Sequence, residues 1–170
     1  MADPLSLDRF NTAAPEELRA PLRACATSSS WAEGLLAGRP YASVGDAVGA
    51  ARDGILALAP AEIDAVLAGH PRIGERPGAA HADGAAHSRR EQSGVDAGDT
   101  DVATRLAAGN AAYEDRFGHV FLIRAAGRDA PEILAELERR MGNDPETERS
   151  EAAGQLAEIT ALRVQGMLAG

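Results

Sequence analysis

The sequence predicts an all-α protein, a single-domain helical bundle of about eight to nine helices with one long loop near residues 70–86. Alanine is abundant while valine and isoleucine are few, which favours helix over strand. Apolar residues recur at the three- and four-residue spacing of an amphipathic helix along most of the chain. Glycines and prolines cluster between Gly69 and Ala86, which breaks that pattern. A chain of 170 residues suits one domain, so we expect residues 1–170 to fold together.

Capping residues and breakers delimit the helices before the loop. Ser6, Thr12 and Ser43 stand where an N-cap is expected, and Gly38 stands where a helix should stop. The expected helices cover residues 6–10, 12–24, 28–38, 44–58 and 60–69.

The helical pattern resumes after the loop. The expected helices cover residues 87–96, 101–117, 130–141 and 145–168, the last with Asp144 as N-cap and Pro145 at its first position. Residues 119–124 contain a short apolar run that fits either an extended segment or one turn of helix.

Composition excludes several classes of function. The net charge is −9 and the pI about 4.9, so nucleic acid and anionic membranes are not expected partners. No apolar run is long enough for a membrane span and the N-terminus has no signal pattern, which predicts a soluble, intracellular protein. All 17 basic residues are arginine; without a lysine, pyridoxal-phosphate, Schiff-base and P-loop chemistry are excluded. The single cysteine, Cys25, fits a packed core position better than a nucleophile.

The loop gathers groups that suit a small anionic ligand. His70, His81 and His87 lie in or beside it, and residues 70–92 carry a net charge of +1 within an acidic chain. His70 is held between a helix end and Pro71, and an imidazole suits proton transfer near neutral pH. Chance clustering in a solvated loop and a helix-capping histidine are the alternatives, and both stay open.

A polar helical face follows the loop. Ser88, Glu91 and Gln92 stand at i, i+3 and i+4, so they share one side of a helix and offer donors and acceptors to an amide-rich molecule. A solvated polar face is the alternative. His87 and Glu91 also have a metal-binding spacing, although no third ligand stands at a recognisable distance.

Two further candidates lie towards the C-terminus. Arg163 follows an apolar stripe on the last helix, where a guanidinium needs either a structural carboxylate or a substrate oxygen as partner. The segment from Phe117 to Ile123 is mainly a packing segment whose backbone groups could bind a ligand if it is extended. His119 within it is a second candidate acid or base, or a surface histidine.

Five motifs in this order resemble the 2-oxo-4-hydroxy-4-carboxy-5-ureidoimidazoline (OHCU) decarboxylase family. They are His70-Pro71-Arg72-Ile73-Gly74, Ser88-Arg89-Arg90-Glu91-Gln92, Asn110…Tyr113…Phe117-Gly118-x-x-Phe121-x-Ile123, Arg140-x-x-Asn143-Asp144…Glu148 and Glu158-Ile159…Arg163. The likeness covers nearly the whole chain.

The resemblance implies decarboxylation of a small anionic ureidoimidazoline to (S)-allantoin, the last step of urate degradation, with no metal and no organic cofactor. It implies that His70, Glu91 and Arg163 are catalytic. The substrate-binding residues that it implies are Pro71, Ser88, Arg89, Arg90, Glu91, Gln92, Leu122, Ile123, Arg124, Ala125, Ala126 and Arg163.

Two other functions stay open from the residues alone. One is a metal-dependent helical hydrolase built on His70, His81, His87 and Glu91, which a chelator would inactivate. The other is a non-enzymatic helical interaction module that binds a partner through the Glu91 face. The oligomeric state is also open, with a homodimer as one candidate.

Overall fold

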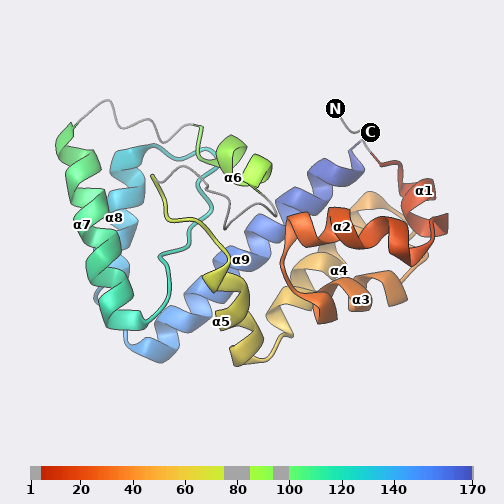
Figure 1. Cartoon of the computed structure of the whole chain (residues 1–170), viewed down its shortest axis with the longest axis horizontal. Coiled ribbons are helices and arrows are strands. Elements are labelled where there is room, and N and C mark those ends of the chain that lie inside the picture. Colours follow the sequence, from red (N-terminus) through yellow and green to blue (C-terminus); the bar gives the residue numbers. More distant parts are fainter. Residues whose placement is uncertain (1–4, 75–84, 94–99, 170) are drawn as a thin grey trace. The chain divides into compact units, whose positions relative to one another are not determined.

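The computed structural model describes residues 5–74, 85–93 and 100–169, and within these ranges it contains nine α-helices and no strand. This confirms the predicted all-α class (Figure 1). The helices are α1 (Leu7–Thr12), α2 (Pro15–Cys25), α3 (Ser29–Ala37), α4 (Val44–Leu56), α5 (Pro60–Ala68), α6 (Ala85–Glu91), α7 (Thr100–Phe117), α8 (Ala130–Arg140) and α9 (Pro145–Leu168). No helix in the described ranges is long and apolar enough to span a bilayer.

Several helices begin where a short polar side chain caps them. Ser6, Ser28 and Ser43 each accept a hydrogen bond from the backbone N–H three residues later, at the starts of α1, α3 and α4. Asp129 and Glu132 form a reciprocal capping box at the start of α8. These bonds satisfy N–H groups that have no partner inside the helix, which is why the sequence pattern located the starts well.

Two boundary predictions are wrong. Thr12 does not cap α2: it ends α1, its hydroxyl donates to the Asp8 carbonyl over 2.8 Å, and α2 begins at Pro15, whose fixed φ suits a first helical position. The helix expected over 87–96 is α6, which begins at Ala85, so the predicted loop 70–86 ends before residue 85. Alanines 85 and 86 favour this earlier start. Residues 75–84 and 94–96 lie outside the described residues.

The C-terminal end of α6 has a local cause. The helix ends at Glu91, and Ser93 folds back on the turn, because its hydroxyl and its N–H both donate to the carbonyl of Arg90. Such side-chain bonds to the backbone compete with helix continuation.

The chain divides into two compact units, one of residues up to Val66 together with those from Ala157 onward, and one from Leu67 to Leu156. In the first unit α3 packs against α2 and α4, and the Trp31 indole donates to the Ala51 carbonyl over 2.9 Å. Cys25 is buried at 1% exposure, as expected for a core position.

The core of the second unit forms where α7 packs against α8. Between these helices the chain runs without helix from Gly118 to Asp129 (Figure 1). This connection crosses the core, because Phe121, Ile123 and Ala125 are buried against Tyr113 and side chains of α8. The apolar run in residues 119–124 is therefore largely buried and has no helix, so the reading as one turn of helix is wrong.

Candidate functional site

His70 stands directly beyond the end of α5, where the sequence placed it. Its backbone N–H donates to the Leu67 carbonyl over 3.0 Å, which joins the residue to the last turn of the helix. The residue is 8% exposed and Pro71 is also buried. Because a proline restricts the conformation of the residue before it, the backbone that carries the His70 imidazole has little freedom.

The segment after His70 is fixed by helix α7. Asn110, which is 4% exposed, donates to the Ile73 carbonyl over 3.1 Å. One turn further on, Glu114 accepts two hydrogen bonds from Arg72, at 2.5 and 2.8 Å. The Arg72 guanidinium lowers the pKa of Glu114 below its ordinary value. On one face of α7, Asn110 thus holds the backbone that follows the candidate acid/base, and Glu114 holds the Arg72 side chain of the same segment.

Helix α6 is joined to the same segment. Gln92 follows the last residue of α6, and its side-chain oxygen accepts from the backbone N–H of Gly74 over 3.1 Å. Gly74 has φ of +87°, a conformation that favours glycine. The structure therefore brings together two motifs that the sequence presented separately, and it shows this oxygen of Gln92 engaged by the protein itself.

The polar face predicted on α6 exists in part. Ser88 is 4% exposed and Glu91 is half-buried, whereas Arg89 and Arg90 are exposed. A buried hydroxyl beside a half-buried carboxylate is less typical of a fully solvated face.

The third candidate element is the segment Leu122–Ala126. Leu122, Ile123 and Ala125 are buried, Ala126 is half-buried and Arg124 is exposed. Arg140 donates to the Leu122 carbonyl over 2.7 Å, and Gln155 accepts from the Arg124 N–H over 2.9 Å. These two side chains come from α8 and α9, and neither was predicted as a site residue.

Arg140 belongs to a buried network that sequence reasoning missed. Its side chain is 1% exposed and forms an ion pair with Glu148, which is fully buried, with Nε–Oε1 at 2.8 Å. Glu148 also accepts from the Tyr113 hydroxyl and from Asn143. Burial and the nearby carboxylate raise the pKa of Tyr113, so the phenol keeps its proton and donates it. The sequence contained a signal for this network, the spacing of Arg140, Asn143 and Glu148. The family resemblance included these residues but assigned them no role.

Arg163 belongs to the first unit, whereas His70 and Glu91 belong to the second. It is 5% exposed, and Nη1 donates to the Cys25 carbonyl over 3.3 Å. The predicted apolar stripe is present, because Leu156 and Ile159 on the same helix are buried. The guanidinium is therefore desolvated and held towards the end of α2 within its unit.

The remaining histidines contribute less to a site. His119 is half-buried, its Nδ1 lies 3.0 Å from the Val120 carbonyl oxygen, and its ring packs edge-on against Tyr113. His81 lies outside the described residues. Among the described residues no group of three or more His, Cys, Asp or Glu side chains is placed to hold a metal ion.

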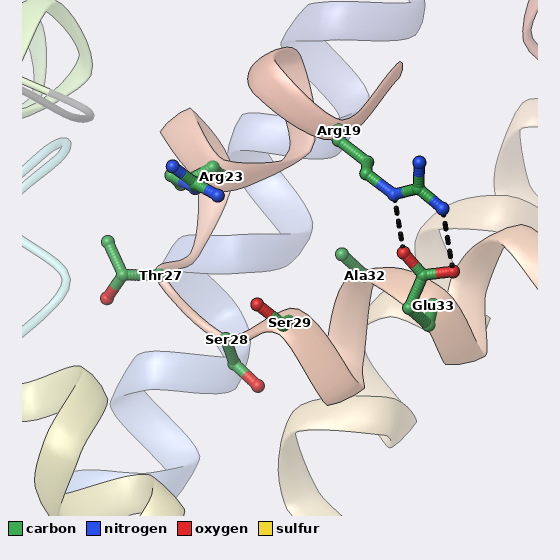
Figure 2. Close-up of a pocket in the computed structure, with 7 residues that line it drawn as sticks. All are labelled: Arg19, Arg23, Thr27, Ser28, Ser29, Ala32 and Glu33. Atoms are coloured by element: carbon green, nitrogen blue, oxygen red, sulfur yellow. Dashed lines mark hydrogen bonds and ion pairs between the residues drawn. The ribbon is translucent and has the colours of Figure 1, made fainter. Parts of the chain in front are cut away.

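A small pocket of about 50 Å³ lies in the first unit, between α2 and the start of α3. Figure 2 shows the ion pair of Arg19 and Glu33 on one side of it and the Thr27 and Ser29 hydroxyls on another. The Arg19 guanidinium lowers the pKa of Glu33. None of the predicted site residues lines this pocket.

Known proteins similar to this chain identify the pattern. A 2-oxo-4-hydroxy-4-carboxy-5-ureidoimidazoline decarboxylase from Amia calva is 31% identical over 140 residues, which is 81% of this chain and 79% of the relative. The uric acid degradation bifunctional protein of Arabidopsis thaliana is 38% identical over 97 residues, 56% of this chain and 30% of that protein. A crystal structure of OHCU decarboxylase in the presence of (S)-allantoin is 27% identical, with a TM-score of 0.75, 89% coverage of this chain and 99% of that chain. The model of the OHCU decarboxylase family matches residues 11–165. The chain therefore belongs to the OHCU decarboxylase family.

Proposed function

We propose that this chain decarboxylates 2-oxo-4-hydroxy-4-carboxy-5-ureidoimidazoline to (S)-allantoin, the last step of urate degradation. The observation that carries the proposal is the family match over residues 11–165. The similar crystal structure, obtained in the presence of (S)-allantoin, supports the same substrate class. The proposal includes a cytoplasmic location, and a homodimer is the assembly to test by light scattering.

The chemistry explains why no cofactor is needed. The substrate carries a carboxylate and a hydroxyl on one ring carbon, next to a C=N bond. When the bond to the carboxylate breaks, its electron pair passes into that conjugated system and carbon dioxide leaves. The ring nitrogen that receives the charge takes up one proton, and a second proton is added to one face of the neighbouring ring carbon. The hydroxyl proton is lost as the carbonyl forms, so the reaction consumes one proton overall. The protein must orient the carboxylate, stabilise developing charge and control where the proton arrives.

In this proposal His70 is the acid/base that contacts the hydroxyl and carboxylate end of the substrate and governs the protonation. Its burial and its place directly before Pro71 support the role, because an acid/base can be positioned only on a backbone of restricted conformation. The segment after His70 is restricted further by hydrogen bonds to three side chains, those of Asn110, Glu114 and Gln92.

The other roles concern binding and charge. Glu91 accepts N–H bonds from the ring or ureido group, and Arg163 stabilises negative charge on a ring oxygen. Ser88, Gln92 and the backbone of Leu122–Ala126 provide polar contacts, and Pro71 shapes the wall beside His70. Because the Gln92 oxygen already accepts from Gly74, the part of its amide left for the substrate is its NH₂ group. Arg89 and Arg90 are exposed, which suits attraction of an anionic substrate.

The experiment that tests the proposal follows stereochemistry. Freshly made urate-oxidation product is added to the purified protein, and the circular dichroism of chiral allantoin is recorded. We expect rapid formation of the (S) form, whereas the uncatalysed reaction gives both mirror forms. His70→Asn should lower turnover by about 10²–10⁴-fold and lose stereocontrol. Full turnover with pure (S) product in this variant would show that His70 is not the acid/base.

Glu91→Gln and Arg163→Lys separate function from folding. Both changes keep the size of the side chain roughly similar, so far-UV helicity should stay near the wild-type value while activity falls. Loss of helicity together with activity would instead favour structural roles for these two residues.

A further inference from the structure

Helix α9 contains a hydroxyl group that the protein itself does not use. Among the described residues, four side chains have a buried polar atom without a hydrogen-bond partner, those of Asp64, Asn110, Arg128 and Thr160. Thr160 stands apart because it is 0% exposed and this hydroxyl is the one polar group of its side chain. The hydroxyl is therefore satisfied neither by the protein nor by bulk solvent.

The buried hydroxyl costs stability that another side chain would not. A helical threonine commonly donates to the carbonyl four residues before it, as Thr104 does to Thr100 over 2.8 Å. Among the described residues Thr160 makes no such bond. Ala157 and Val164 on the same helix are buried and apolar, and a valine would fill the space of Thr160 without a polar group. A residue that breaks the local pattern at a cost in stability is expected at a functional site.

Arg163 lies one turn beyond Thr160, so the two side chains share one face of α9. In a helix a long side chain leans towards the preceding turn, and for Arg163 that turn contains Thr160. Both residues belong to the first unit and are at most 5% exposed. Arg163 donates to the Cys25 carbonyl, whereas the Thr160 hydroxyl accepts no bond from the guanidinium. Two neighbouring buried donors that do not bond to each other suit one oxygen atom of a ligand.

We propose that Thr160 is a further substrate-binding residue, whose hydroxyl donates a hydrogen bond to the same oxygen that Arg163 holds. The inference rests on the proposed function, because that oxygen is then the ring oxygen of the ureidoimidazoline on which negative charge develops. The guanidinium supplies the charge, and the neutral hydroxyl fixes the direction from which the oxygen is held. The hydroxyl keeps its proton throughout, so the role is binding and orientation.

The kinetic test uses three variants. Thr160→Val replaces the hydroxyl by a methyl group of nearly the same size, and Thr160→Ser keeps a hydroxyl but loses the methyl group. Thr104→Val is the matched control, because it makes the same change at an exposed helical position whose hydroxyl is already bonded within its own helix. We expect kcat/KM to fall about tenfold in Thr160→Val and by no more than about threefold in Thr160→Ser, with Thr104→Val at the wild-type value.

Stability distinguishes this role from a structural one. The unfolding of the ligand-free variants is followed by denaturant titration. We expect Thr160→Val to be at least as stable as wild type, because it removes an unsatisfied buried hydroxyl, and Thr160→Ser to be less stable, because it leaves a cavity. The order of the two variants is thus opposite for stability and for activity. An unchanged kcat/KM in Thr160→Val would overturn the proposal, and so would a loss of activity accompanied by a loss of stability.

A binding measurement separates this proposal from the proposed function. (S)-Allantoin is added to wild type and to Thr160→Val, and the midpoint of thermal unfolding is recorded. We expect a smaller rise of the midpoint in Thr160→Val, since the variant lacks one bond to the bound molecule. Equal rises in the two proteins refute the role of Thr160 while the proposed function stands. If wild type does not consume the ureidoimidazoline, the proposed function and the assigned substrate contact both fail, and the ligand-free stabilities still decide whether the hydroxyl is unsatisfied.

Discussion

Glu148 is the fully buried ion-pair partner of the buried Arg140, and a second, less buried carboxylate, that of Glu151, lies 4.0 Å from the Arg140 Nε. The Arg140 and Glu148 side chains are at most 1% exposed. Glu148→Gln removes the nearer charge but keeps the shape, which leaves the buried cation with the more distant carboxylate of Glu151. We expect the free energy of unfolding to fall by about 3–5 kcal/mol, measured by denaturant titration.

Glu138→Gln is the control for this prediction. It makes the same change in an ion pair with Arg105 in which both side chains are 53% exposed, and such surface pairs are worth about 0–1 kcal/mol. A loss in Glu148→Gln no larger than that in Glu138→Gln would show that the buried pair is not needed to compensate the guanidinium.

The location of a single residue was best predicted where its neighbours in the chain determine the local backbone geometry. The position of His70 beyond a helix and before Pro71 followed from adjacent residues alone. The engagement of Gln92 by Gly74 and of Arg140 by Leu122 did not, because each joins residues 18 positions apart whose meeting depends on tertiary packing. The catalytic and binding roles themselves stay predictions.

At the scale of elements, α7 is the support of the segment after His70, and its Glu114 makes that support sensitive to pH. The pKa of Glu114 is lowered from about 4.5 by the Arg72 guanidinium, so its folded-state pKa lies below its unfolded value. The stabilisation is therefore complete above about pH 4.5 and is lost as the pH falls through the folded pKa. We expect wild type to exceed Glu114→Gln in thermal stability at pH 7, and the difference to vanish only below pH 4.5.

Asp115→Asn is the neighbouring control, because Asp115 is exposed on the same helix. Its effect should not follow the same pH dependence. A difference between wild type and Glu114→Gln that grows as the pH falls from 7 to 4 would contradict the assigned contact.

Helices were predictable as elements because caps and breakers act over a few residues. Seven of the nine have both ends within two residues of the expected position. The start of α2 lies three residues later than expected, and α6 differs because its end depends on Ser93 and Arg90 rather than on a distinct stop signal. The segment between α7 and α8 had two readings from its apolar run, since burial of Phe121 and Ile123 is compatible with either backbone form. The form that the backbone takes depends on hydrogen-bond partners in α8 and α9, and a local sequence pattern does not contain these partners.

At the scale of the whole molecule, the candidate catalytic groups are distributed over the two units. His70 and Glu91 belong to the second unit and Arg163 to the first, while α9 supplies residues to both. The order of motifs in the sequence could not reveal this division, because two compact units need not follow chain order. The family resemblance nevertheless assigns all three residues to one reaction, and kinetics can test that assignment directly.

A double-mutant cycle of His70→Asn and Arg163→Met provides this test. Residues that act on the same transition state are strongly non-additive, because removing one already forfeits most of what the other contributes. We expect the double variant to lose little more kcat/KM than the worse single variant, within about tenfold. Losses that multiply fully would show that the two residues act independently, and Arg163 would then be assigned to the stability of its own unit through the bond to the Cys25 carbonyl. Unfolding measurements on the Arg163→Met variant decide that last point, because a structural role lowers its stability whether or not substrate is present.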